Sequence, residues 1–150
     1  MIQMSNVELV SYKIVKLRVN NNIPESAMLE LESMVGFNVK YESNNGAAVA
    51  VLTVSVNHRN DPDLLCIELE IQGGFSMNGI NDMDSKKEAH VKCYDELFPC
   101  ANQIMTYLAI NSGMQGFMLK KPPMEFANVN FGIRPDGMDS GKVIKLWSDI

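Results

Sequence analysis

The sequence has few of the residues that mark disulfide-held, membrane-spanning or nucleic-acid-binding proteins. Its 150 residues include only three cysteines, Cys66, Cys93 and Cys100. An odd count, with no secretory leader visible at the N-terminus, favours reduced thiols in a reducing compartment. The longest uninterrupted apolar run, Ala47–Leu52, is far too short to span a membrane. We therefore expect a soluble, cytoplasmic protein.

Basic residues are also scarce, and the charge is unevenly distributed. The formal net charge is −5, and residues 61–100 hold nine acidic but only three basic side chains. Because phosphate contacts rely on Lys and Arg, neither nucleic acid nor an anionic membrane is expected as a partner. The apolar and charged shares, 46% and 21%, are those of a globular protein, and they exclude collagen-like and disordered classes. A chain of this length predicts one domain over residues 1–150 with its own core.

The first half of the chain has the pattern of β-strands separated by polar turns. Extended segments are expected at Val7–Val19, Phe37–Tyr41, Ala47–Val56, Leu65–Ile71 and Phe75–Ile80. In the fourth of these, apolar residues alternate with Cys66, Glu68 and Glu70, which predicts one buried and one acidic face. The pair Gly73-Gly74 is expected to separate the last two segments.

Two stretches in this half leave alternatives open. In the first segment the apolar phase changes between Ile14 and Val15, which indicates a bulge, a twist, or burial on both faces. Residues 25–35 fit either a strand or a short helix, because periodicity over so few residues cannot decide.

The second half begins with a long helical pattern. Ser85–Glu88 has the form of a capping box and predicts a helix running to about Asn111, ended by Ser112-Gly113. Pro99 lies inside it, and either kinks this helix or starts a second one. One helix face is apolar: Leu97, Ala101, Ile104, Met105 and Leu108. The remaining chain is rich in Gly and Pro, and residues 127–150 are expected to form an irregular tail with short extended pieces at Asn128–Ile133 and Val143–Trp147. The fold class is α+β, with a four-stranded antiparallel sheet and a long helix packed on one face.

No catalytic, metal or cofactor site stands out. His90 and Cys93 are three residues apart on the helix, but no other ligand pair accompanies them, so a structural role is expected. Asp95 and Glu96 could provide a helix-borne general base, although they also fit as acidic residues near a helix N-terminus. We therefore predict that the protein is not an enzyme and needs no cofactor.

Methionine is the one residue type in clear excess, with 11 copies. Met-rich grooves can bind many apolar sequences, but methionine also fills irregular cores. Composition alone favours core filling, the family resemblance given below brings an adaptable client surface level with it, and the exposure of Met77 and Met118 would decide between them.

Two segments resemble the SecB protein-export chaperone family. Gly73–Ile80 reads Gly-Gly-Phe-Ser-Met-Asn-Gly-Ile and resembles the family's Gly-Ile-Phe-Ser-Ile-Ala-Gly-Ile. Leu97–Asn102 reads Leu-Phe-Pro-Cys-Ala-Asn and resembles Leu-Phe-Pro-Tyr-Ala-Arg in the family's main helix. Downstream, Ser112-Gly113 resembles the Arg-Gly helix end, and Pro123–Phe126 resembles Pro-Val-Asn-Phe. Order and approximate spacing agree from about Leu64 to Phe126.

The resemblance implies a homotetramer, a dimer of dimers in which helices meet, that binds unfolded polypeptides in apolar grooves without ATP. Carried over to this sequence, it assigns an assembly face to Leu65, Ile67, Leu69 and Ile71. It assigns a surface facing the SecA motor to Glu68, with Glu70 beside it. The apolar client-binding groove is assigned to Phe75, Met77, Ile80, Leu97, Phe98 and Met118.

This sequence also departs from the family pattern. Cys100 and Asn102 replace the family's Tyr and Arg. Residues 127–150 hold three basic and three acidic side chains, so the family's acidic, SecA-contacting tail is missing. A SecB-like chaperone that serves another partner, such as a toxin–antitoxin pair, is therefore a fair variant. The rival from another class is a hot-dog-like acyl-thioester enzyme with Asp95 or Glu96 as its acid. In the hot-dog fold the central helix comes early, between strands, whereas in this sequence the predicted strands precede the helix. The order of the elements therefore distinguishes the hot-dog fold from the SecB-like fold.

Overall fold

The fold is described from a computed structural model of the whole chain. The described residues are 6–24, 30–114, 117, 119–123, 131–133, 139–141 and 144–149, the last three ranges by their backbone only. Within them, no helix is long and apolar enough to cross a membrane.

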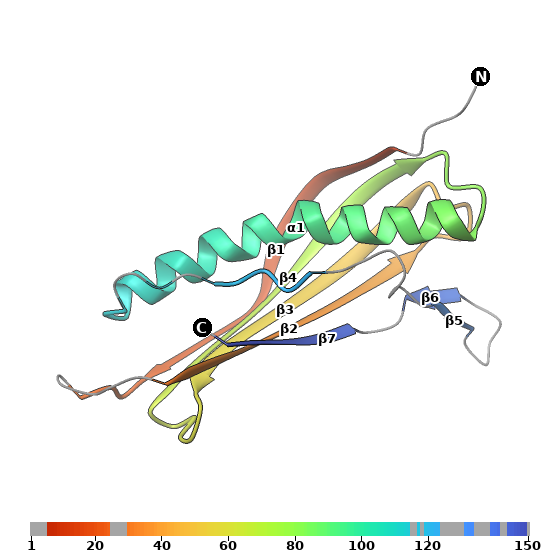
Figure 1. Cartoon of the computed structure of the whole chain (residues 1–150). Coiled ribbons are helices and arrows are strands. Elements are labelled where there is room, and N and C mark those ends of the chain that lie inside the picture. Colours follow the sequence, from red (N-terminus) through yellow and green to blue (C-terminus); the bar gives the residue numbers. More distant parts are fainter. Residues whose placement is uncertain are drawn as a thin grey trace.

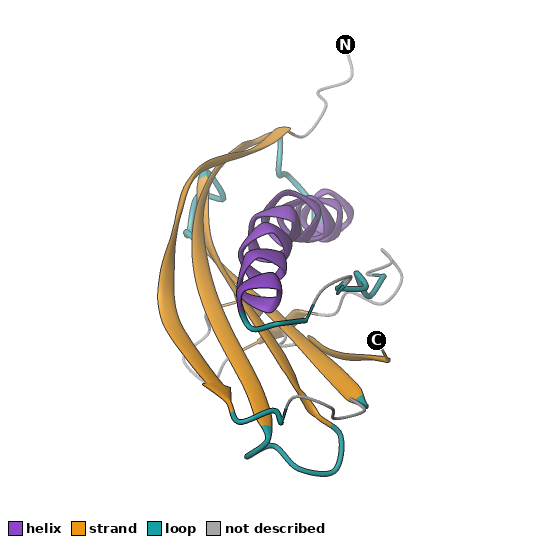
Figure 2. Cartoon of the chain, turned by 90° about the vertical axis from the view of Figure 1, so that its left-hand side faces the viewer, coloured by secondary structure: helices purple, strands orange, loops and turns teal. Residues whose placement is uncertain are grey.

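Four long strands form an antiparallel sheet that curves around one helix (Figures 1 and 2). The strands are β1 (Asn6–Asn21), β2 (Leu31–Tyr41), β3 (Ala47–His58) and β4 (Leu65–Asn78), in the spatial order β1-β4-β3-β2. The turn between β2 and β3 contains Asn45 at a φ of 53°, the backbone conformation that an Asn-Gly pair tolerates. The predicted fold class is confirmed.

The described part of the ambiguous stretch 25–35 is strand, since β2 begins at Leu31. The expectation of a break at Gly73-Gly74 was wrong, because β4 continues through both glycines to Asn78. Both residues stay paired with β1, Gly73 opposite Tyr12 and Gly74 opposite Ser11, and this pairing holds the backbone extended.

Strand β1 contains two register shifts against β4, at Val10 and at Val15. Ile14 lies opposite Ile71 and Lys16 opposite Glu70, so Val15 is an extra residue in the ladder. The apolar phase change at Ile14–Val15 is therefore a bulge. It returns Leu17 to the face that Ile14 occupies and leaves Lys16 on the opposite, acidic face.

One helix, α1 (Met83–Asn111), follows the sheet. It begins earlier than predicted, because the N-cap is Asp82 and not Ser85. The Asp82 carboxylate accepts a hydrogen bond from the Ser85 backbone N–H at 2.7 Å, and the Ser85 hydroxyl accepts from the Asp82 N–H at 3.1 Å. At the other end Gly113 has a φ of +89°, so the predicted helix end is confirmed.

Pro99 lies inside α1 and does not divide it into two helices. The helix bends near its middle (Figures 1 and 2). Proline removes one backbone hydrogen bond and crowds the preceding turn, which accounts for the bend. The bend keeps α1 close to the twisted sheet over its length.

The core lies between α1 and the concave face of the sheet (Figure 2). Strand β4 contributes every second residue to it, including Leu65, Ile67, Leu69 and Ile71. From the helix, Leu97, Ala101 and Met105 are fully buried. The alternation of apolar and polar residues in the sequence of β4 thus corresponds to side chains that point alternately into the core and to the outer face of the sheet.

The C-terminal part adds three short strands, β5 (Phe131–Ile133), β6 (Asp139–Gly141) and β7 (Ile144–Asp149). β5 and β6 pair with each other, and β7 pairs antiparallel with β2 as a fifth strand of the large sheet. These strands lie inside the range expected to be an irregular tail. The rest of residues 127–150 lies outside the described residues.

Candidate functional site

An apolar surface remains uncovered along β1. Six of its large hydrophobic side chains are exposed by 43% or more: Val10, Tyr12, Ile14, Val15, Leu17 and Val19. Val10 and Val15 are the bulge residues, while Tyr12, Ile14, Leu17 and Val19 are paired with β4 residues of the inner face. Exposed apolar side chains in this number on one edge strand indicate a surface that binds other protein.

The inner side of this strand forms a groove with the C-terminal half of α1. We call it the β1–α1 groove; its lining residues are Tyr12, Ile14, Leu17, Gln103, Ile104, Tyr107 and Leu108. Its volume is about 450 Å³, enough for several side chains of a bound segment. Tyr107 and Ile110 extend the apolar surface along the helix, with exposed fractions of 68% and 53%.

The residues predicted to line a client-binding groove lie elsewhere. Five of them, Phe75, Met77, Ile80, Leu97 and Phe98, are buried in the chain's own core. Their side chains therefore offer no surface to a client in this conformation. The reason is that α1 covers the part of the concave face from which Phe75 and Met77 extend, and that Leu97 and Phe98 belong to α1 itself and are buried in the same core. Met118 lies outside the described residues.

The burial of Met77 favours the core-filling interpretation of the methionines, and Met105 and Met114 are buried as well. Met83 is 51% exposed, at the start of α1. None of the methionines that the structure describes lines the β1–α1 groove, whose apolar lining residues are Ile, Leu and Tyr.

The four residues predicted to form an assembly face are also buried. Leu65, Ile67, Leu69 and Ile71 are 2% exposed or less, packed under α1. Their direct contacts lie within the chain, so any influence on assembly would act through the core and the sheet.

Glu68 and Glu70 lie on the outer face of the sheet, as predicted. The register places Arg18 opposite Glu68 and Lys16 opposite Glu70, and the Lys16 ammonium lies 3.4 Å from a Glu68 carboxylate oxygen. A hollow of about 180 Å³ on this face includes Lys16, Met34, Thr53 and both glutamates. On the outer face of the sheet, the positive charges of Lys16 and Arg18 in β1 thus offset part of the negative charge of Glu68 and Glu70 in β4.

His90 and Cys93 face the core and not a metal site. The His90 Nδ1 lies 3.3 Å from the Tyr41 hydroxyl, and the His90 ring packs edge-on against Phe37. Burial lowers the pKa of His90 to about 4, and burial raises the pKa of the Cys93 thiol to about 12. Among the described residues, no three His, Cys, Asp or Glu side chains gather closely enough to hold a metal ion.

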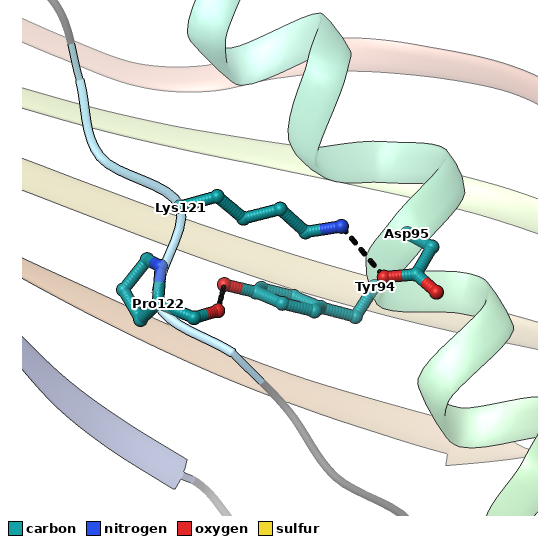
Figure 3. Close-up of polar contacts among 4 residues, drawn as sticks. All are labelled: Tyr94, Asp95, Lys121 and Pro122. Atoms are coloured by element: carbon teal, nitrogen blue, oxygen red, sulfur yellow. Dashed lines mark hydrogen bonds and ion pairs between the residues drawn. The ribbon is translucent and has the colours of Figure 1, made fainter.

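Asp95 is engaged by the segment that follows the helix. We call this segment the strap; its described residues are Met114, Phe117 and Leu119–Pro123. The Lys121 ammonium lies 2.6 Å from an Asp95 carboxylate oxygen, and the Tyr94 hydroxyl donates a 2.6 Å hydrogen bond to the Pro122 carbonyl (Figure 3). A carboxylate held by a lysine on an exposed surface is poorly placed to act as a general base.

The β1–α1 groove was missed by sequence reasoning, although a signal for it existed. The segment Val7–Val19 carries apolar residues in both strand phases, more than a half-buried strand needs. The bulge explains only part of this excess. The remainder could have been read as a surface meant for contact with other protein.

The arrangement suits binding better than chemistry. It offers an exposed apolar groove, an open strand edge and no gathered set of reactive side chains among the described residues. A bound partner would gain free energy by covering apolar area.

The fold is similar to that of a solved SecB-like chaperone. The structure is that of Rv1957 from Mycobacterium tuberculosis in complex with a ChAD peptide from the Rv1956 HigA1 antitoxin. It shares 12% sequence identity, covers 77% of this chain and 90% of its own, and has a TM-score of 0.59. No family model and no curated protein sequence matches the chain. The SecB-like fold expected from the motifs is thereby supported at the level of the structure.

Proposed function

We propose that this protein is an ATP-independent chaperone, a holdase that binds apolar segments of non-native polypeptides. The observation that carries the proposal is the exposed apolar surface of β1 and the β1–α1 groove, on a SecB-like fold. A surface of this kind gains free energy when protein covers it, at about 25 cal/mol per Å² before ordering costs. Binding of this type needs no nucleotide and no reactive group, and we propose that the protein is not an enzyme.

The same surface supports assembly of identical chains. β1 is the edge strand of the large sheet, and among the described residues no strand pairs with its outer side. An edge with exposed apolar side chains favours pairing with another chain. We propose a homo-oligomer, a dimer of dimers, in which a second copy covers part of β1 and helices meet near Tyr107 and Ile110.

The partner is better described as an antitoxin-like polypeptide than as the export motor. The neighbouring structure holds an antitoxin peptide, which supports a toxin–antitoxin type of client. An export role would use Glu68 and Glu70 to contact SecA, but Lys16 already engages Glu68, and residues 127–150 carry no acidic excess. Cys66, Cys93 and Cys100 are free thiols, which agrees with a cytoplasmic location.

The test is suppression of client aggregation. Several chemically denatured proteins are diluted into buffer without ATP, with and without a severalfold excess of this protein, and light scattering is recorded. We expect reduced scattering for most clients. The groove variant Ile14→Ser/Tyr107→Ser should protect less, whereas Val49→Ser, an exposed valine opposite Gly74 in β4, serves as the control. Unchanged scattering for every client would refute the proposal.

The hot-dog-like enzyme was the alternative from another class, and both the chain order and the pairing of Asp95 count against it. Its discriminating feature is chain order, and here β1 to β4 all precede α1. Its catalytic acid would be Asp95 or Glu96, and Asp95 is paired with Lys121. Acyl-thioester hydrolysis that disappears in Asp95→Ala would reverse the ranking.

A further inference from the structure

The two edges of the large sheet differ in what covers them. At one edge no described strand pairs with the outer side of β1, whereas at the other edge β7 lies along β2 (Figure 1). β7 pairs antiparallel with β2 over its 6 residues, from Ile144 opposite Phe37 to Asp149 opposite Glu32. The chain's own C-terminal part therefore covers the β2 edge.

The β2 edge lacks the features that keep an uncovered edge from pairing with another chain. From Ser33 to Val39 it contains no proline and no charged residue. It pairs with β3 and with β7 without a register shift, so no bulge interrupts it. Edge strands are protected by charges, proline, bulges or a covering segment. In this part of β2, the covering segment β7 provides the protection.

β7 repeats the sequence of β1 at the opposite end of the same cross-strand rows, where a row is the set of residues that pair across neighbouring strands. Three consecutive rows end in the same residue type at both edges of the sheet: Ile14 and Ile144, Lys16 and Lys145, and Leu17 and Leu146. The bulge at Val15 brings Ile14 and Lys16 into neighbouring rows. β7 therefore presents the same residue types as β1, in the same rows.

β7 also runs in the direction that β1 of a second copy would take beside β2. Each strand in the order β1-β4-β3-β2 is antiparallel to the next, so β1 and β2 run in opposite directions. A second copy that continued the sheet beyond β2 would place its β1 there, antiparallel to β2, as β7 is. Continued along the rows, its Leu17 would lie opposite Val35, which is the partner of Leu146.

We propose that the β2 edge is a second self-association surface that fits β1 of another copy, and that β7 imitates this strand and occupies its place. Addition of β1 to β2 is head-to-tail, because each added copy again presents a free β2 edge, and it generates open-ended filaments. With β7 in place only β1 remains open, and the contact of β1 with a second β1 is isologous and closes. This inference goes beyond the holdase function and does not depend on client binding.

One row favours β1 of a second copy over β7. Asp149 lies opposite Glu32, and like charges directly opposite each other disfavour strand pairing. The β1 end of the same row is Asn20, which carries no charge. β7 holds the edge because it belongs to the same chain and is therefore present at a high effective concentration. A substitution that weakens β7 leaves the edge to a second copy.

The test is Leu146→Asp in the full chain, because a charge opposite the buried Val35 disfavours the pairing of β7 with β2. Leu146→Val is the matched control, since it keeps an apolar residue there. Sedimentation velocity measures the mean mass at several protein concentrations. We expect the mean mass of Leu146→Asp to rise about 3-fold over an approximately tenfold rise in concentration, as in open-ended assembly. The unaltered protein and Leu146→Val should keep a constant mass.

A second variant separates filaments from aggregates of unfolded chains. Leu17→Asp/Leu146→Asp weakens β7 and also removes the apolar residue with which β1 would replace it, so its mass should not rise with concentration. Growth of this double variant to the same masses would assign the growth to unfolding and overturn the inference. A concentration-independent mass of Leu146→Asp would also overturn it.

A disulfide locates the contact between copies. Arg18 and Met34 end one row on β1 and β2, so within one chain their Cα atoms are three strand spacings, roughly 14 Å, apart. This distance is too long for a disulfide. In Leu146→Asp with Arg18→Cys/Met34→Cys, we expect oxidation to link chains through these two cysteines, as identified by mass spectrometry.

The control for the disulfide places the second cysteine in a different row. In Leu146→Asp with Arg18→Cys/Asn38→Cys, the link between chains should be severalfold less abundant, because Asn38 belongs to another row. Equal yields for the two pairs, or no link between positions 18 and 34, would overturn the inference. Suppression of client aggregation is a separate measurement, so either result leaves the holdase function to be judged on its own.

Discussion

Gly73 and Gly74 are neighbours in β4 that face opposite sides of the sheet. A Cβ atom on Gly73 would lie 2.8 Å from Leu97 Cδ1, in the packed core, whereas a Cβ atom on Gly74 would come no closer than 3.9 Å to any atom, the nearest being Ser11 Oγ. We expect Gly73→Ala to lower the free energy of unfolding by about 1–3 kcal/mol, because overpacking displaces the helix. Gly74→Ala should change it by at most about 0.5 kcal/mol. Urea unfolding of both variants checks this, and equal effects would contradict the packing described for Leu97.

His90 gives the stability of the fold a dependence on pH. Burial lowers its pKa from 6.5 to about 4, so the unfolded chain binds a proton in a pH range where the folded chain does not. The stability present above pH 6.5 is therefore lost as pH falls towards 4, by up to about 3 kcal/mol at 1.36 kcal/mol per pKa unit. Urea unfolding at several pH values between 7 and 4 measures the slope. In His90→Gln the slope over this range should be shallower, and an unchanged slope would assign it to other groups.

At the scale of the element, the bulge at Val15 lets β1 stay paired with β4 although its apolar residues change strand phase there. Because Ile14 pairs with Ile71 and Lys16 with Glu70, removing Val15 would leave both pairs in place without a register shift between them, and only the shift at Val10 would remain. We expect deletion of Val15 to preserve the fold, with a Tm within a few degrees of the original. Deletion of Val54 should abolish folding, because β3 pairs without register shifts and half of its side chains would change face. Circular dichroism with thermal melting distinguishes the two deletions, and unfolding of the Val15 deletion would show that the bulge itself is required.

At the scale of the whole molecule, the open edge of β1 predicts assembly. One chain has a mass of 16.7 kDa, and we expect a multiple of this mass in solution, four chains if the dimer of dimers forms. Ile14→Ser/Tyr107→Ser should shift the distribution towards single chains, since it removes apolar area from the β1–α1 groove. Val49→Ser on the outer face should not. Sedimentation velocity measures all three proteins, and a single-chain mass for the unaltered protein would refute the oligomer while leaving client binding to be tested on its own.

Local periodicity was enough to predict most of the elements. Alternation defined β4 as far as Ile71, and the phase change at Ile14–Val15 left a bulge, a twist or burial on both faces open, of which the strand register shows the bulge. The apolar helix face predicted the middle of α1, and Gly113 predicted its C-terminal end. These features depend on neighbours within a few residues, so they can be read along the chain. The start of α1 was misplaced because Asp82 and Ser85 can each serve as an N-cap. The residue that caps the helix depends on the path of the chain after β4.

The sequence by itself determined which residues of this protein are apolar, and in most strands which side chains share a face. Only the tertiary structure decided which of those faces remain in contact with water. Phe75 and Tyr12 both extend from the concave side of the sheet, yet Phe75 is buried and Tyr12 is 44% exposed. The difference is made by α1 and the strap, which come later in the chain and cover one part of the sheet but not the other. Burial is a property of neighbours that are distant in sequence, so the predicted client-binding residues became core and the open surface formed along β1.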